Sequence, residues 1–131
     1  MNGGQHTEPL WAWLALRQAP GIGPLACKRL IDRFGSPEAV LAAETEALVQ
    51  VEGVGRKSAQ AISQGMTAKF AREEIARCQK RGFRIVPLPH KEYPDRLSRI
   101  WDPPPYLYAF GRPLSRQPAI AVVGTRNPSR Y

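Results

Sequence analysis

The turn Gly124-Thr125-Arg126 has residue types suited to holding an anion. It directly follows the apolar run from Ala119 to Val123, which is typical of a buried parallel strand. Gly124 lets the backbone approach an anion closely, and Arg126 offers a planar fork of N–H donors. Asn127-Pro128 then has the order of a helix cap and first helical residue. We therefore expect a phosphate-facing turn, and the alternative is an ordinary turn at a strand end.

The same turn does not indicate a nucleotide cofactor. The chain has neither the G-x-G-x-x-G fingerprint nor a P-loop lysine at this strand end. We expect no cofactor. Because the sequence ends at Tyr131, shortly after the helix start, we expect the chain to be part of a longer protein.

Two Gly-X-Gly turns, Gly21 to Gly23 and Gly53 to Gly55, lie 32 positions apart and mark an internal repeat. Apolar positions align at the same offset, Leu16 with Leu48 and Leu30 with Ile62. Each copy has the pattern helix, tight turn, helix. In such a helix-hairpin-helix unit, the N–H groups that begin the second helix can meet a DNA phosphate.

The two copies differ at the residues after the turn. Arg56 and Lys57 follow the second turn, whereas Pro24 and Leu25 follow the first. Gly53, Gly55, Arg56 and Lys57 are therefore candidate phosphate contacts, and the first hairpin is expected to be structural. The alternative for the whole tandem is a module that docks a protein and binds no DNA.

The net charge of +8 lies entirely in the second half of the chain. Residues 1–65 carry six basic and six acidic residues, so we expect this part to bind duplex DNA weakly or not at all. Residues 66–131 carry thirteen basic and five acidic residues, which favours a polyanionic partner. The alternative is a basic surface that only aids solubility.

The composition indicates a cytoplasmic protein without a membrane segment. No apolar run approaches the roughly 20 residues that span a bilayer, and no secretory signal precedes residue 10. Cys27 and Cys78 have no CxxC spacing, so we expect reduced cysteines and no metal site.

Periodicity predicts about five short helices over residues 10–65, followed by a long amphipathic helix from Met66 to Arg81. Phe70, Ile75 and Cys78 are expected on or near one face of that helix. Three strands are expected after it, over residues 84–88, 106–110 and 119–123. Helices followed by strands predict an all-α domain and then the opening of an α/β sheet.

Tyr106 and Tyr108 share one face of the second expected strand. We therefore expect both side chains to pack against a helix, and the alternative is that they stack on bases.

The order of motifs resembles the DNA-processing protein A family (DprA, also called Smf). The resemblance covers roughly residues 10–131. Its motifs are the tandem hairpins, Tyr93-Pro-Asp-Arg-Leu97, the segment Asp102 to Gly111, and the segment Ala119 to Arg126 with Ser129-Arg-Tyr131.

The resemblance implies a polar tail over residues 1–9, a tandem helix-hairpin-helix (SAM-like) domain over 10–65, and the first part of a Rossmann-like domain over 66–131. It implies a non-catalytic protein that binds single-stranded DNA, protects incoming strands in natural transformation and loads RecA. Gly124, Thr125 and Arg126 would hold DNA phosphates, with the Thr125 hydroxyl as a donor. Full-length members form homodimers, which we do not expect of this chain alone. The enzymatic alternative, hydrolysis of a nucleotide glycosidic bond, needs a pair of acidic residues that this sequence does not offer.

Overall fold

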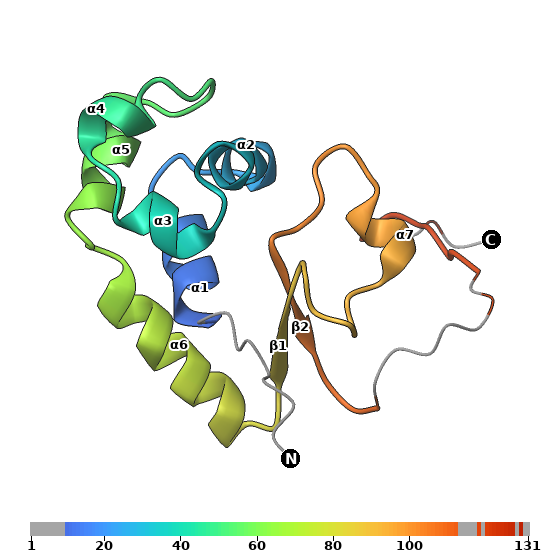
Figure 1. Ribbon diagram of the computed structural model, residues 1–131. Helices are drawn as coiled ribbons and strands as arrows, with labels where there is room; N and C mark the ends of the chain where they lie inside the picture. Colours follow the sequence, from blue (N-terminus) through green and yellow to red (C-terminus); the bar gives the residue numbers. More distant parts are fainter. Residues whose placement is uncertain (1–9, 113–117, 119, 128, 130–131) are drawn as a thin grey trace, which may run out of the picture.

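The structure is a computed structural model, and it describes residues 10–112, 118, 120–127 and 129. Within these ranges the chain forms seven helices and a two-stranded ribbon (Figure 1). The elements, in chain order, are α1 Leu10–Gln18, α2 Pro24–Phe34, α3 Pro37–Leu41, α4 Thr45–Leu48, α5 Arg56–Ser63, α6 Ala68–Lys80, β1 Arg84–Pro87, α7 Asp95–Ser98 and β2 Tyr106–Ala109. An all-α part followed by the start of a sheet is the fold class that the sequence predicts.

The internal repeat is visible in the backbone of the two hairpins. The N–H of Ile22 donates to the carbonyl of Ala19, and the N–H of Val54 donates to that of Val51, both at 3.1 Å. Each hydrogen bond closes the turn that ends the first helix of its hairpin. Since the paired positions are 32 residues apart, the predicted repeat is confirmed as two copies of one hairpin.

The two hairpins also pack on each other reciprocally. Gly21 has φ +76°, and a Cβ there would lie 2.9 Å from the Ser58 hydroxyl oxygen on α5. Gly53 has φ +89°, and a Cβ there would lie 3.8 Å from the Cβ of Ala26 on α2. Ser58 and Ala26 are themselves 32 positions apart. Each turn therefore contacts the second helix of the other hairpin, and glycine is needed for its backbone conformation.

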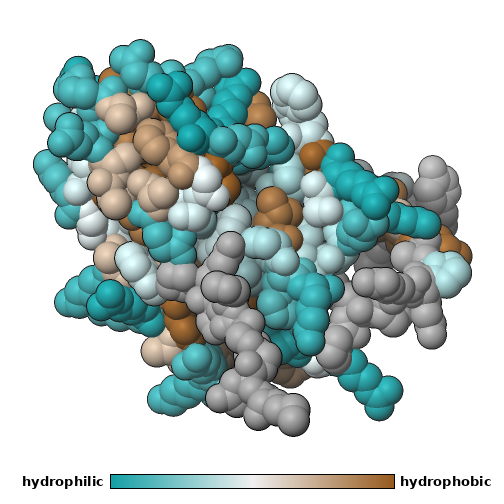
Figure 2. All heavy atoms as spheres, in the orientation of Figure 1, coloured by the Kyte–Doolittle hydropathy of each residue, from teal (hydrophilic) through white to brown (hydrophobic). Residues whose placement is uncertain are grey.

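A first hydrophobic core joins the hairpins. Leu16, Leu30, Leu48 and Ile62 are all fully buried in it, as the aligned apolar positions predict. Each such side chain contributes about 1.5–3 kcal/mol through burial. Val40 of α3 completes the same cluster. Figure 2 shows mostly hydrophilic residues on the outside of this part, with a small apolar patch over α3 and α4.

A second core joins α1 to the elements that follow the hairpins. Trp13, Leu14 and Ala15 are buried on α1 and cluster with Ala71 of α6. Partly buried Ile75, Ile85, Leu88 and Tyr106 pack against them. The Thr67 hydroxyl also donates to the carbonyl of Ala15 at 2.6 Å, at the start of α6. The helix α1 thus belongs to both cores, and packing continues across residue 65.

One expectation for α6 is wrong. Phe70 is 43% exposed and lies on the outer surface, where its ring faces the Arg77 guanidinium at 5.5 Å. Ala71, Ile75 and Cys78 instead form the inner stripe, at the i, i+4, i+7 spacing of one helical face. Phe70 lies one residue before this stripe, and therefore about 100° around the helix from Ala71.

The ribbon confirms the first two predicted strands, with slightly shorter bounds. Strands β1 and β2 pair antiparallel, with Ile85 opposite Tyr108. The rings of Tyr106 and Tyr108 meet edge to face at 5.7 Å, and the Tyr108 hydroxyl donates to Glu74 of α6 at 3.1 Å. The expectation that this strand face packs against a helix is confirmed for Tyr106, which joins the second core, whereas Tyr108 contacts α6 through its hydroxyl and is 48% exposed.

The third predicted strand is wrong for the residues that the structure describes. Residues 120–123 form no strand, and Ile120, Val122 and Val123 are each more than 90% exposed. A strand needs a neighbouring backbone for its hydrogen bonds, and no described segment supplies one here. The helix start at Pro128, the polar tail at 1–9 and Ala119 lie outside the described residues.

Candidate nucleic-acid interface

The turn before α5 presents backbone donors at an open surface. Gly55 is the N-cap of α5, with φ −80° and ψ 163°, and no side chain caps the helix. The first-turn N–H groups therefore have no side-chain partner, and a helix N-terminus favours an anion. A Cβ on Gly55 would meet nothing within 4 Å. The fold therefore does not require glycine at position 55. Close approach of a phosphate to the backbone there would require it, because a side chain would stand in the way.

The two basic residues of this turn have different surroundings. The Arg56 guanidinium makes two hydrogen bonds to the Glu46 carboxylate, at 2.9 and 3.3 Å. This pairing holds the pKa of Glu46 below its usual value. Lys57 is exposed and forms no ion pair with any described residue. Of the two cations, Lys57 is the one available to a ligand.

A third cation, which the sequence analysis missed, comes from the other hairpin. Arg29 of α2 donates to the carbonyl of Glu52 at 3.3 Å and lies 3.4 Å from the Glu52 carboxylate. Its guanidinium is 3.7 Å from the position that a Cβ on Gly53 would take. Only the reciprocal packing of the hairpins brings Arg29 to this turn, so no local pattern in the sequence indicates it.

The first hairpin has fewer donors for a phosphate. Gly23 caps α2, but the first helical residue is Pro24, which has no N–H. Arg17 turns inward and donates to the carbonyl of Ile22 at 2.8 Å. The Arg17 guanidinium therefore stabilises the first turn through this hydrogen bond.

Gly124, Thr125 and Arg126 are all exposed, and they lie in a segment without regular structure. The Thr125 hydroxyl donates to the carbonyl of Asn127 at 2.9 Å, which closes a local turn. Arg126 forms no ion pair with a described residue. The described residues do not bring this turn and the second hairpin together into one pocket. Arg130 and Tyr131 of the same motif lie outside the described residues.

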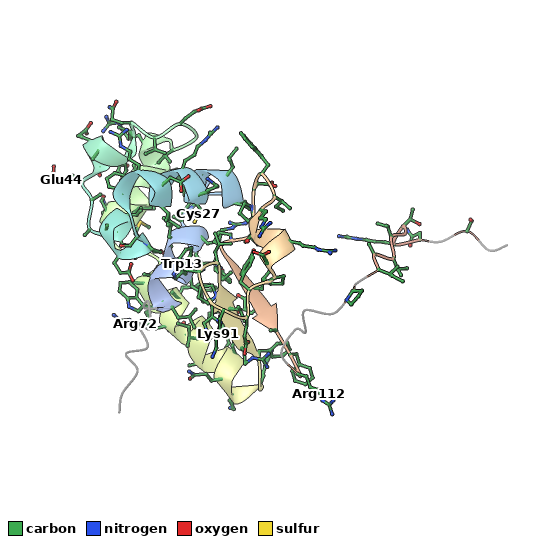
Figure 3. The ribbon with its side chains drawn as sticks, turned by 45° about the vertical axis from the view of Figure 1, so that its right-hand side comes forward. Trp13, Cys27, Glu44, Arg72, Lys91 and Arg112 are labelled. Carbon is green, nitrogen blue, oxygen red and sulfur yellow. The ribbon has the colours of Figure 1, made fainter. Side chains whose placement is uncertain are left out.

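Neither cysteine offers a reactive thiolate. Burial raises the pKa of the Cys27 thiol to about 12, against the opposing charge of Arg17. Burial and the nearby Glu74 carboxylate also raise the pKa of Cys78. Both cysteines are free, and Figure 3 shows Cys27 on α2. In the part of the chain that the structure describes, no three His, Cys, Asp or Glu side chains form a metal-binding group.

Comparison with known protein families shows to which class of protein this chain belongs. Residues 14–65 match the family model of a SAM-like helix-hairpin-helix tandem, and residues 84–131 match that of DNA recombination-mediator protein A. The chain is thus a tandem of hairpins followed by the start of a recombination-mediator domain.

The chain belongs to the DprA/Smf family of DNA recombination mediators. It is 33% identical over 124 residues to protein Smf of Synechocystis, an alignment that covers 91% of this chain and 31% of Smf. The chain thus spans about a third of the length of this curated relative. No solved structure matches the chain significantly. Among the described helices, none is long and apolar enough to cross a membrane.

Proposed function

We propose that this chain is the DNA-contacting amino-terminal part of a cytoplasmic, non-catalytic recombination mediator that binds single-stranded DNA. The observation that carries the proposal is that one chain joins two reciprocally packed hairpins to the start of a recombination-mediator domain. The whole protein would protect incoming strands, load RecA and act as a homodimer. The excess of basic residues after residue 65 supports the polyanionic ligand.

Two sets of residues would divide the contacts to DNA. Gly124, Thr125 and Arg126 would hold phosphates at the turn of the sheet domain. The second hairpin would add Lys57 and the free N–H groups that begin α5, next to Gly55. Because these are contacts to phosphates, they would not discriminate between base sequences.

Protein docking is the competing function of the hairpin tandem. It is favoured by the Arg56–Glu46 pair and by the balanced charge of residues 1–65. Fluorescence anisotropy with a labelled oligo-dT strand and a duplex of equal length separates the two functions. We expect the chain to bind the single strand more tightly than the duplex. Absence of binding to either oligonucleotide would support docking instead.

The role of the second hairpin is tested by Gly55→Ala, with Gly23→Ala as the matched control. Both glycines cap a helix, and a Cβ at either position meets nothing within 4 Å. Each substitution should change the free energy of unfolding by less than about 1 kcal/mol, because the lower entropy of the unfolded chain offsets the poorer cap.

Only Gly55→Ala should weaken oligo-dT binding, because its methyl group blocks the approach of a phosphate. The expected loss is about 0.5–1.5 kcal/mol, which is roughly two- to tenfold in Kd. Anisotropy titrations at low salt measure this difference. Equal affinities of the two variants for oligo-dT would show that the second hairpin does not contact the DNA.

A further inference from the structure

The end of the ribbon, where β2 leaves the sheet beside the last turn of α6, carries aromatic and basic side chains. We call this the ribbon-end surface and define it by Arg81, Phe83, Tyr108, Phe110 and Arg112. Two hollows of about 270 and 310 Å³ lie there, and Tyr108 lines both. Arg81 and Phe83 line the first hollow, and Phe110 and Arg112 line the second.

The aromatic part of this surface is exposed but held in place. The rings of Phe83 and Phe110 are 5.1 Å apart at an interplanar angle of 41°. Phe110 is 72% exposed and Phe83 is 39% exposed. Gly82 has φ +73°, and a Cβ there would lie 3.9 Å from the Phe110 ring. One ring is thus supported by the other and by a glycine backbone, and most of Phe110 remains uncovered.

Four arginines surround these rings, and two of them are already partnered. Arg77 pairs with Glu74, which lowers the pKa of that carboxyl group. Arg84 lies 3.4 Å from the Glu92 carboxylate and donates to the carbonyl of Gly111 at 2.6 Å. This second contact fixes the backbone between Phe110 and Arg112.

The other two arginines are free to bind a ligand. The side chains of Arg81 and Arg112 have no hydrogen-bond or ion-pair partner among the described residues, and both are exposed. Figure 3 shows Arg112 pointing away from the end of β2. The surface therefore combines an open aromatic ring with two exposed guanidinium groups that form no ion pair with a described residue.

We propose that the ribbon-end surface is a second binding site for single-stranded nucleic acid, separate from the Gly124-Thr125-Arg126 turn. A base would stack on Phe110, and the flanking phosphates would contact Arg81 and Arg112. Aromatic stacking platforms beside cations are how proteins bind single strands without sequence preference. A duplex keeps its bases stacked internally, so it would offer only its phosphates. The inference rests on the proposed function, because it names a further contact to the same ligand.

The test measures binding of the 131-residue chain to labelled oligo-dT and to an abasic strand of equal length. Phe110→Ala should weaken oligo-dT binding about 5- to 100-fold and leave the salt dependence unchanged, because stacking involves no counterion. Phe110→Trp should retain the affinity for oligo-dT.

Arg112→Ala should make the salt dependence of oligo-dT binding shallower by about 0.7 in slope. Since both side chains are exposed, the thermal melts of these variants should match that of the parent chain.

Matched controls come from exposed residues elsewhere. Trp101→Ala removes an aromatic side chain that is 76% exposed, and Arg96→Ala removes an exposed cation of α7. Trp101→Ala should leave oligo-dT affinity unchanged, and Arg96→Ala should affect it less than Arg112→Ala does. Oligo-dT binding that is as tight for Phe110→Ala as for the parent chain would overturn this inference and leave the proposed function intact. Equal affinity for the abasic strand would overturn it as well. Failure of the parent chain to bind any oligonucleotide would contradict both.

Discussion

Replacing Trp13 by alanine is expected to lower the free energy of unfolding by about 3–5 kcal/mol. Trp13 is buried on α1 at the centre of the second core, which includes Ala71 of α6 (Figure 3). Its removal leaves a cavity between helices that lie far apart in the sequence. Urea denaturation followed by circular dichroism measures the loss.

The control for this prediction is Trp101→Ala. Trp101 is largely exposed, and its loss should change the free energy of unfolding by less than about 0.5 kcal/mol. If the two substitutions lowered the free energy of unfolding by the same amount, Trp13 would not stabilise the packing of α1 against α6.

The second core bears on how the chain divides into domains. A division near residue 65 is our proposal from the sequence, with a protease-resistant fragment ending between residues 65 and 82. Thr67 and Ala71 pack on α1 from beyond residue 65. Because Ile85 and Tyr106 pack on the same core, we propose that the resistant fragment includes α6 and extends into the ribbon.

Replacing Arg126 by alanine, in a protein that carries the whole recombination-mediator domain, is expected to weaken single-strand binding by about 1–3 kcal/mol. This is the usual range for a charge-assisted hydrogen bond. The loss should be nearly independent of base sequence, since a phosphate contact carries no base information. The salt slope should become shallower by about 0.7. Oligonucleotide titrations at several salt concentrations measure all three effects.

Arg126→Lys provides the matched variant. It keeps the charge but not the two parallel N–H donors, so it should restore only part of the affinity. If Arg126 instead pairs with a carboxylate of the protein, Arg126→Ala would lower the melting temperature and leave both affinity and salt slope unchanged. That result would remove Arg126 from the binding site.

The hairpin tandem was predictable because its determinants are local. The 32-residue offset of Gly21 and Gly53 fixes two tight turns, and the apolar positions around them, such as Leu30 and Ile62, form the core. Ser36 before Pro37 has the order of a helix cap and first helical residue, and the Ser36 side chain accepts the Ala39 N–H at 3.2 Å at the start of α3.

The remaining features depend on tertiary partners that no local pattern reveals. Helical spacing predicts a stripe on α6 but not that Ala71, rather than the larger Phe70, faces the core. Similarly, the sequence shows Arg56 beside the turn but not its pairing with Glu46, ten residues earlier. The run that ends at Val123 has the composition of a strand, yet strand formation requires a neighbour that the described residues do not contain.

The salt dependence of oligo-dT binding by this chain tests the central claim most directly. Lys57, Arg81, Arg112 and Arg126 are the cations that we assign to phosphates. Four such contacts predict that the logarithm of the association constant falls with the logarithm of salt concentration with a slope of about −2 to −3. Tight binding at low salt with that slope is the expected result. A slope near zero, or no binding to any single strand at low salt, would contradict the assignment of this chain to single-stranded DNA.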